Sequence, residues 1–235
     1  QVTSCSDQII VPVILVKTLG IGAISLTMNY DPSVLTFTGY QNMHPAIAAG
    51  FANLVNPSAN SVYFSWYSSM PLNILYDTLV ELIFTSPAGG TTNLTWDLAT
   101  PGNCEFSDLA TNVIPATFIA GSVNAIPPPA ITSQPMDADI TEGQNTSFSV
   151  TATSATGYQW QVSDDGGTTW YDQTDGAMYQ GSNTAQLDIY GATVYMDDFM
   201  YRCVVSGTCL PIATSDAAML NVRPIITTWI GQVVR

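Results

Sequence analysis

The sequence predicts an all-β protein of two β-sandwich domains joined by a proline-rich linker. Three observations support this prediction. Charged residues make up only 9% of the chain, whereas long amphipathic helices need many Glu and Lys residues. Short apolar or alternating runs rich in Val, Thr and Tyr recur between turn signals, as in strands of sandwiches. Three consecutive prolines at residues 127–129 divide the chain and favour a stiff, extended linker.

The first half, residues 1–124, is predicted to be one sandwich. Turn-forming sequences at residues 31–33, 56–60 and 86–90 separate its apolar runs. Residues 43–55 are the exception, because they suit a short helix or an apolar loop. The predicted strands cover residues 9–16, 22–29, 34–40, 61–67, 77–85, 91–98 and 116–123.

The second half is predicted as a linker at residues 125–130, a sandwich at 131–222 and a strand-like tail at 223–235. Trp160 lies in an alternating run before the turn-forming sequence DDGG, where an immunoglobulin-like strand carries its core tryptophan. Tyr201 stands two residues before Cys203 and four after Asp197, the spacing of a tyrosine corner. Trp160 and Tyr201 are therefore the predicted structural core.

Two stretches resemble known families. Residues 11–37, VPVILVKTLGIGAISLTMNYDPSVLTF, are similar to the opening strands of cohesin-type domains, including the Y-D-P-S-V-L turn. That resemblance implies a sandwich of the jelly-roll type and a module that docks a protein partner. Residues 157–173 and 184–207 resemble immunoglobulin-like repeats of secreted Bacteroidetes surface proteins, through the runs YQWQVSDDGGTTW and YRCVVSGTC. The second resemblance implies a secreted protein of the cell surface.

The charge excludes several partners. The net charge is −14, and Lys17, Arg202, Arg223 and Arg235 are the only Lys and Arg residues. Nucleic-acid binding needs a basic surface, and anionic membranes would repel this chain. No apolar run reaches the length of about 18 residues that a membrane span needs. Because no leader-like segment opens the sequence, we expect a mature secreted form.

The even number of cysteines predicts two disulfides formed in an oxidising compartment. The strand expected to carry an inter-sheet cysteine has Phe148 and Val150 instead. We therefore expect Cys203 to pair with the nearby Cys209, across a hairpin. Cys5 is then expected to pair with Cys104.

Residues for catalysis are scarce. His44 is the single histidine, and no serine lies in a G-x-S-x-G motif, so a Ser-His-Asp triad is not expected. One histidine and paired cysteines do not make a zinc site. The cluster Asp137, Asp139 and Glu142 is a weak calcium candidate, for which ordinary turn chemistry is the preferred interpretation. We expect a non-enzymatic protein without cofactor or metal.

The aromatic residues suggest a binding role beside a packing role. Most of them are expected in the core. Trp170 and Tyr171 follow a predicted hairpin tip, and are the candidates for contacts with a glycan or a protein.

The tail raises the question of assembly, because six strand-forming residues follow Arg223-Pro224, where proline ends the preceding strand. Four interpretations stay open: the first strand of a further domain, a strand folded back on its own sheet, a flexible remnant, or a strand added to another molecule. The last would build a head-to-tail filament. The leading hypothesis is a secreted, non-enzymatic structural or adhesive protein of the cell surface that serves as an extracellular filament subunit. The alternative is a protein- or carbohydrate-binding module. The tail residues are Ile225, Ile226, Trp229, Ile230, Val233 and Val234.

Overall fold

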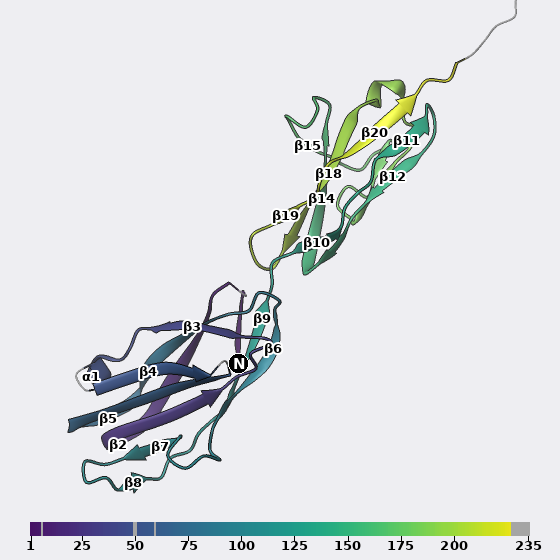
Figure 1. Ribbon diagram of the computed structural model, residues 1–235. Helices are drawn as coiled ribbons and strands as arrows, with labels where there is room; N and C mark the ends of the chain where they lie inside the picture. The colour runs from purple at the N-terminus through teal and green to yellow at the C-terminus, as the bar shows by residue number, and fades with distance from the viewer. Residues whose placement is uncertain (6, 49–50, 59, 227–235) are drawn as a thin grey trace, which may run out of the picture. The chain divides into compact units, whose positions relative to one another are not determined.

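A computed structural model describes residues 1–5, 7–48, 51–58 and 60–226. It divides into two compact units, Gln1–Pro127 and Pro128–Arg235 (Figure 1). Strands dominate both units, as the predicted all-β fold class requires. The linker is shorter than expected, because Ala125 and Ile126 belong to the last strand of the first unit and Ala130 begins the next strand. No helix in the described residues is long and apolar enough to cross a membrane.

Two long antiparallel strands, β2 (Ile9–Asn29) and β5 (Ser61–Thr85), form the centre of the first unit (Figure 1). The sequence predicted each as two separate strands. The ladder instead continues through bulges between Val13 and Ile14 and between Thr18 and Ala23. A bulge bends and twists a strand without ending it, so the turn-like sequences around Gly20 and Pro71 bend the ribbon rather than break it.

The remaining strands of the first unit extend this ribbon on both sides. The strand order is β1-β9-β6-β2-β5-β3, with β4 on β5 and β7 between β2 and β8. The short helix α1 (Pro45–Ala48) falls in the segment where a helix or loop was expected. The other strands are β1 (Val2–Cys5), β3 (Thr36–Gln41), β4 (Phe51–Ser58), β6 (Gly90–Trp96), β7 (Glu105–Ser107), β8 (Val113–Ile114) and β9 (Gly121–Ile126).

Alternation in β2 places one set of side chains in the core. Val11, Val13 and Leu15 are buried, while Ile14 and Val16 are exposed, as expected for a sheet with one buried face.

Two further predictions are wrong in this unit. Residues 51–58, expected as helix, loop or turn, form β4, and the strand expected at 116–123 begins only at 121. The first of these segments contains Ala, Pro and Asn, which are poor local signals for a strand.

The second unit has the layers of an immunoglobulin-like sandwich. One sheet has the order β11-β20-β18-β14-β15, with β19 on β18, and another has β12-β17-β16; β10 pairs with β13. Their bounds are β10 (Ala130–Ser133), β11 (Ala138–Thr141), β12 (Thr146–Ser149), β13 (Thr151–Thr153), β14 (Ala155–Ser163), β15 (Tyr171–Asp172), β16 (Tyr179–Gln180), β17 (Gln186–Ile189), η1 (Val194–Met196), β18 (Phe199–Gly207), β19 (Ala213–Thr214) and β20 (Ala218–Arg223).

Trp160 and Tyr201 are fully buried in this second core. The Trp160 indole N–H donates to the Thr184 carbonyl at 3.0 Å. The Tyr201 hydroxyl does not bond the backbone as a tyrosine corner would; it shares a hydrogen bond of 3.1 Å with the Tyr179 hydroxyl. Its ring stacks on Phe148 at 4.9 Å. A polar group this deep needs a partner, and the second tyrosine provides it.

The expected disulfide pairs are wrong. Cys104 and Cys203 are free thiols, whereas Cys5 and Cys209 are disulfide-bonded. The register explains why Cys203 and Cys209 do not meet: β18 and β19 pair Val204 with Thr214. This register sets Ser215 across from Cys203, and Cys209 falls in the loop beyond the ladder.

Cys5 and Cys104 lie near opposite ends of β6. Cys5 is level with Ile126 on β9, whose neighbour Ala125 pairs with Gly90 at the start of β6. The Cys104 sulfur lies 3.5 Å from the Thr27 carbonyl, beside the Trp96 end of that strand. The length of β6, about 20 Å at 3.3 Å per residue, separates the two ends.

Candidate functional site

Exposed apolar side chains gather where the β2–β5 ribbon bends. Met70, Leu75 and Tyr76 are 74%, 71% and 72% exposed, and Val16 and Leu19 on β2 are more than half exposed. Val16 and Tyr76 are direct cross-strand partners. Large exposed apolar side chains near one another are candidates for an interaction surface. We call these five residues the ribbon-bend patch.

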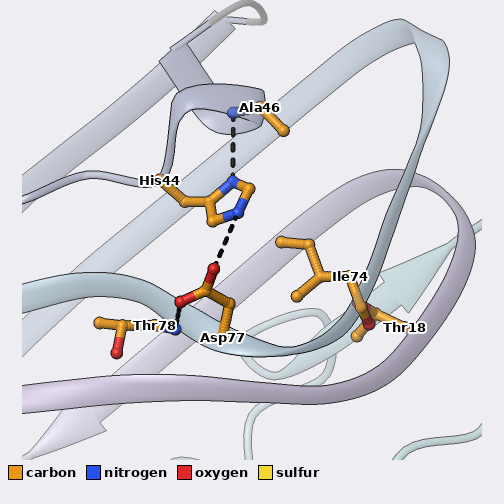
Figure 2. Close-up of polar contacts among 6 residues, drawn as sticks. All are labelled: Thr18, His44, Ala46, Ile74, Asp77 and Thr78. Atoms are coloured by element: carbon orange, nitrogen blue, oxygen red, sulfur yellow. Dashed lines mark hydrogen bonds and ion pairs between the residues drawn. The ribbon is translucent and has the colours of Figure 1, made fainter.

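Polar contacts hold the bend in its shape. The Thr18 hydroxyl donates to the Ile74 carbonyl at 2.9 Å (Figure 2), and the Gly20 amide donates to Asn73 Oδ1 at 2.8 Å. Lys17 and Gly20 have φ angles of 55° and 72°, in the left-handed region. A non-glycine residue in this region is uncommon and often marks a constrained functional segment. The patch therefore sits on a braced turn of the ribbon.

His44 lies close to the bend and braces α1 against β5 (Figure 2). Its Nε2 lies 3.5 Å from Asp77 Oδ2, and its Nδ1 accepts the Ala46 amide at 3.1 Å. An accepting Nδ1 places the proton of the neutral ring on Nε2, which faces the carboxylate. Asp77 also accepts the Thr78 amide at 2.7 Å. Both ring nitrogens are thus occupied by structural contacts.

An apolar groove of about 700 Å³ runs beside the same ribbon. Two extended stretches of backbone line it, residues 11–19 of β2 and residues 114–119 between β8 and β9. The second stretch is tied down where the Trp96 indole donates to the Ile119 carbonyl at 2.9 Å. Phe118 stacks on Phe106 at 5.8 Å. Core side chains complete the lining: Leu26, Met28, Leu94, Trp96 and Phe106.

The sequence did not single out the ribbon-bend patch. Val16 ends the strand predicted at residues 9–16, and the other four residues lie between predicted strands, in the stretches 17–21 and 68–76. A signal was present in the second stretch, because apolar residues there stand next to each other instead of alternating with polar ones.

The predicted aromatic contacts, Trp170 and Tyr171, have different environments. The Arg202 guanidinium carbon lies 4.1 Å from the centroid of the Trp170 ring, and the indole N–H donates to the Gly167 carbonyl at 2.9 Å. One face of Trp170 is therefore already used by a cation–π contact. Tyr171 is exposed. A ligand role for this pair stays a prediction.

The hairpin before these aromatics is built on Asp165. Its carboxylate accepts the amides of Thr168 and Thr169, at 3.0 and 2.8 Å, and the hydroxyls of Ser163 and Thr169. The hydrogen bond from the Thr169 hydroxyl is the largest of the effects that lower the pKa of Asp165 to about 2. These bonds favour the ionised carboxylate.

The weak calcium candidate is split among separate contacts. Asp137 Oδ1 accepts the Met219 amide at 2.7 Å, and Asp139 pairs with Arg223 at 3.8 Å. The amide of Glu142 donates to the Arg223 carbonyl. Within the described residues, no three or more His, Cys, Asp or Glu side chains come together as a metal site would require.

The tail is described only at its start. Ile225 and Ile226 are exposed after the end of β20. Trp229, Ile230, Val233 and Val234 lie outside the described residues. The role of the tail in assembly stays a prediction.

Comparisons with known proteins concern the fold. No protein-family model and no curated protein matches the chain. A non-cellulosomal cohesin from the archaeon Archaeoglobus fulgidus is 17% identical, with a TM-score of 0.44 over 53% of this chain and 84% of its own. The seventh ScaB type I cohesin from Pseudobacteroides cellulosolvens is 20% identical, with a TM-score of 0.44 over 52% of this chain and 86% of its own.

Immunoglobulin-like domains form the second group of similar structures. The M4 domain of titin is 20% identical, with a TM-score of 0.32 over 40% of this chain and 95% of its own. Each of these similarities covers about half of this chain or less. An origin in Bacteroidetes stays a prediction.

Proposed function

We propose that the chain is a secreted, non-catalytic protein that binds another protein through the ribbon-bend patch of its first unit. The observation that carries this proposal is the exposure of Met70, Leu75 and Tyr76 on a braced bend. Met and Tyr are enriched in the centres of protein interfaces. The patch joins several aliphatic side chains to one aromatic ring, which suits a protein surface better than a stacked sugar.

The cysteines and the charge support a location outside the cell. Cys5 and Cys209 are disulfide-bonded, and disulfides persist in oxidising compartments. The net charge of −14 keeps copies of the chain apart in solution. An apolar patch on such a surface favours a heterologous partner over self-association.

The test uses the full chain as bait on intact cells of the source organism, with chemical cross-linking and mass spectrometry. The double variant Leu75→Ser/Tyr76→Ser removes the centre of the patch. Tyr195→Ser is the matched control, because Tyr195 is 86% exposed in the second unit. We expect one partner to be captured by the wild type and the control and lost with the double variant. Equal capture by all three proteins would falsify the proposal.

Assembly through the tail is a second candidate function. The exposure of Ile225 and Ile226 supports it, because strand-forming apolar residues next to a sheet are stabilised by pairing. Deletion of residues 225–235 tests it by electron microscopy of purified protein. Filaments formed by the full chain and lost on deletion would support this candidate; the same particles in both samples would end it.

A further inference from the structure

The groove beside β2 follows a strand edge without a partner. Among the described residues, β2 pairs on its second edge only from Ala23 onward with β7, and at Met28 and Asn29 with β6. Its earlier part pairs with β5 alone. Residues 115–120, across the groove, belong to no strand. The groove thus lies where one further strand of the sandwich would fit.

The backbone of β2 forms part of the groove lining. Pro12, Ile14 and Val16 line the groove, although their side chains are exposed on the outer face of the sheet. Pro12 has no N–H and is paired with Glu81, so its nitrogen must face away from β5. Since hydrogen-bonding direction alternates along a strand, Ile14 and Val16 present their N–H and C=O groups to the same edge. These groups need hydrogen-bonding partners.

Those backbone groups decide between kinds of occupant. An aliphatic chain would cover Val13 and Leu15 but leave the N–H and C=O groups of the edge unsatisfied, which is costly in a buried site. A peptide strand satisfies them and places every second side chain on the apolar lining. The stretch from Val11 to Leu19 accommodates a strand of about nine residues, roughly 30 Å long.

Lys17 selects the charge of the occupant. It lines the groove near one end of this edge and is the only lysine of the chain. Among the described residues, the ion pairs are His44 with Asp77 and Arg223 with Asp139, so the Lys17 ammonium has no carboxylate partner. In a chain of net charge −14, this cation favours an acidic group on the ligand.

We propose that the groove binds an extended peptide segment of a protein partner, which adds to the free edge of β2. The segment carries apolar residues at alternate positions and a carboxylate that pairs with Lys17. This inference rests on the proposed function, because the partner that meets the ribbon-bend patch supplies the strand. Val16, Leu19 and Tyr76 belong both to the ribbon-bend patch and to the lining of the groove.

Two labelled synthetic peptides test the proposal on the full chain. Each has about nine alternating Val and Thr residues, with a single Glu in one peptide and Lys at the same position in the other. We expect the Glu peptide to bind with a Kd below about 1 mM, at least about tenfold tighter than the Lys peptide. Hydrogen exchange of the Ile14 and Val16 amides should slow when the Glu peptide binds.

Two variants identify the edge and the charge. Ile14→Pro removes an edge N–H as Pro12 already does, and should weaken the Glu peptide at least about tenfold. Lys17→Glu should reverse the preference between the two peptides. Circular dichroism checks that both variants fold, and Lys17→Glu decides the matter if Ile14→Pro does not fold. No binding of either peptide at about 1 mM, or an unchanged preference in Lys17→Glu, overturns the proposal.

Other occupants give distinct results, and each would overturn the proposal. Binding of dodecanoate in place of both peptides would identify an aliphatic carboxylate as ligand. A dimer disrupted by Ile14→Pro would identify a second copy of the chain as the occupant.

The peptide and capture experiments separate the two proposals. If the peptides fail to bind while Leu75→Ser/Tyr76→Ser still abolishes partner capture, only the groove proposal falls. If the peptides bind and the double variant has no effect on capture, only the proposed function falls.

Discussion

The amide of Cys203 donates to the hydroxyl of Ser215 at 2.8 Å, in the position where a bridge to Cys209 had been expected. The Ser215 hydroxyl in turn donates to the Asp216 carbonyl at 2.8 Å. A serine thus closes this part of the β18–β19 hairpin with hydrogen bonds. The thiol of Cys203 is left in the core, where burial raises its pKa to about 11.

This arrangement predicts the thiol content of the protein. Unfolded in urea without reductant, the chain should react with Ellman's reagent at Cys104 and Cys203. In the folded protein near pH 8, Cys203 should not react, because the buried thiol stays protonated and inaccessible. Cys203→Ala should lower the number of reactive thiols in urea by one and leave the number in the folded protein unchanged. A chain without reactive thiols in urea would contradict the structure.

Asp165 predicts a pH dependence of stability. Its pKa is lowered to about 2 in the folded protein, against about 3.9 in an unfolded chain. The ionised carboxylate therefore stabilises the fold above about pH 4, and this contribution is lost as the pH falls through about 2. We expect Asp165→Asn to be less stable than the wild type at pH 7 and to show less of this acid loss.

Urea titrations between pH 7 and pH 2 measure the Asp165 effect. Asp164→Asn is the matched control, because the hairpin hydrogen bonds come from Asp165. Parallel stability curves for the wild type and Asp165→Asn would show that the hairpin carboxylate does not contribute.

The packing of Phe84 leads us to expect that its truncation strongly destabilises the first unit. Its side chain is fully buried and meets Tyr30 and Phe37 edge-on, at 5.2 and 5.5 Å. Phe84→Ala should lower the free energy of unfolding by about 3–5 kcal/mol through lost burial and the cavity left behind. Thermal and urea unfolding measure this loss. Ile119→Ala, at a residue 82% exposed, should change it by less than about 0.5 kcal/mol.

The two contacts of His44 should make small contributions to stability that variants can measure separately. Asp77→Asn should cost less than about 1 kcal/mol of stability, because the pair is partly exposed and screened by solvent. His44→Ala should cost about 1 kcal/mol more, since it also removes the acceptor of the Ala46 amide. Urea unfolding of both variants and of the double variant gives the coupling between them. A larger loss for Asp77→Asn than for His44→Ala would contradict this order.

Local pattern was enough to predict the fold class and the second core. Trp160 and Tyr201 follow alternating runs with a recognisable spacing, and burial depends mainly on that alternation. The continuity of β2 was not predictable in this way. Leu19, Gly20 and Gly22 look like a turn, and only pairing with distant residues of β5 keeps the strand intact.

The ribbon-bend patch was not predicted from the sequence for a related reason. Leu75 and Tyr76 are strand-forming apolar residues, yet both are exposed in the long ladder of β5 with β2, which extends beyond the strands that the sequence predicted. The cysteine pairing could not be predicted from the sequence for the same reason. The bridge expected at Cys203 depended on hairpin register, which the turn geometry sets and spacing along the chain does not reveal.

The parallel ladders that close each unit have a mechanical consequence. In the first unit β1 pairs in parallel with β9, from Val2 with Val123 to Cys5 with Ile126; in the second, β11 pairs in parallel with β20. Tension on the two ends of either unit pulls such strands past one another. Their hydrogen bonds then carry the load together instead of opening one after another, so each sandwich is built to resist stretching.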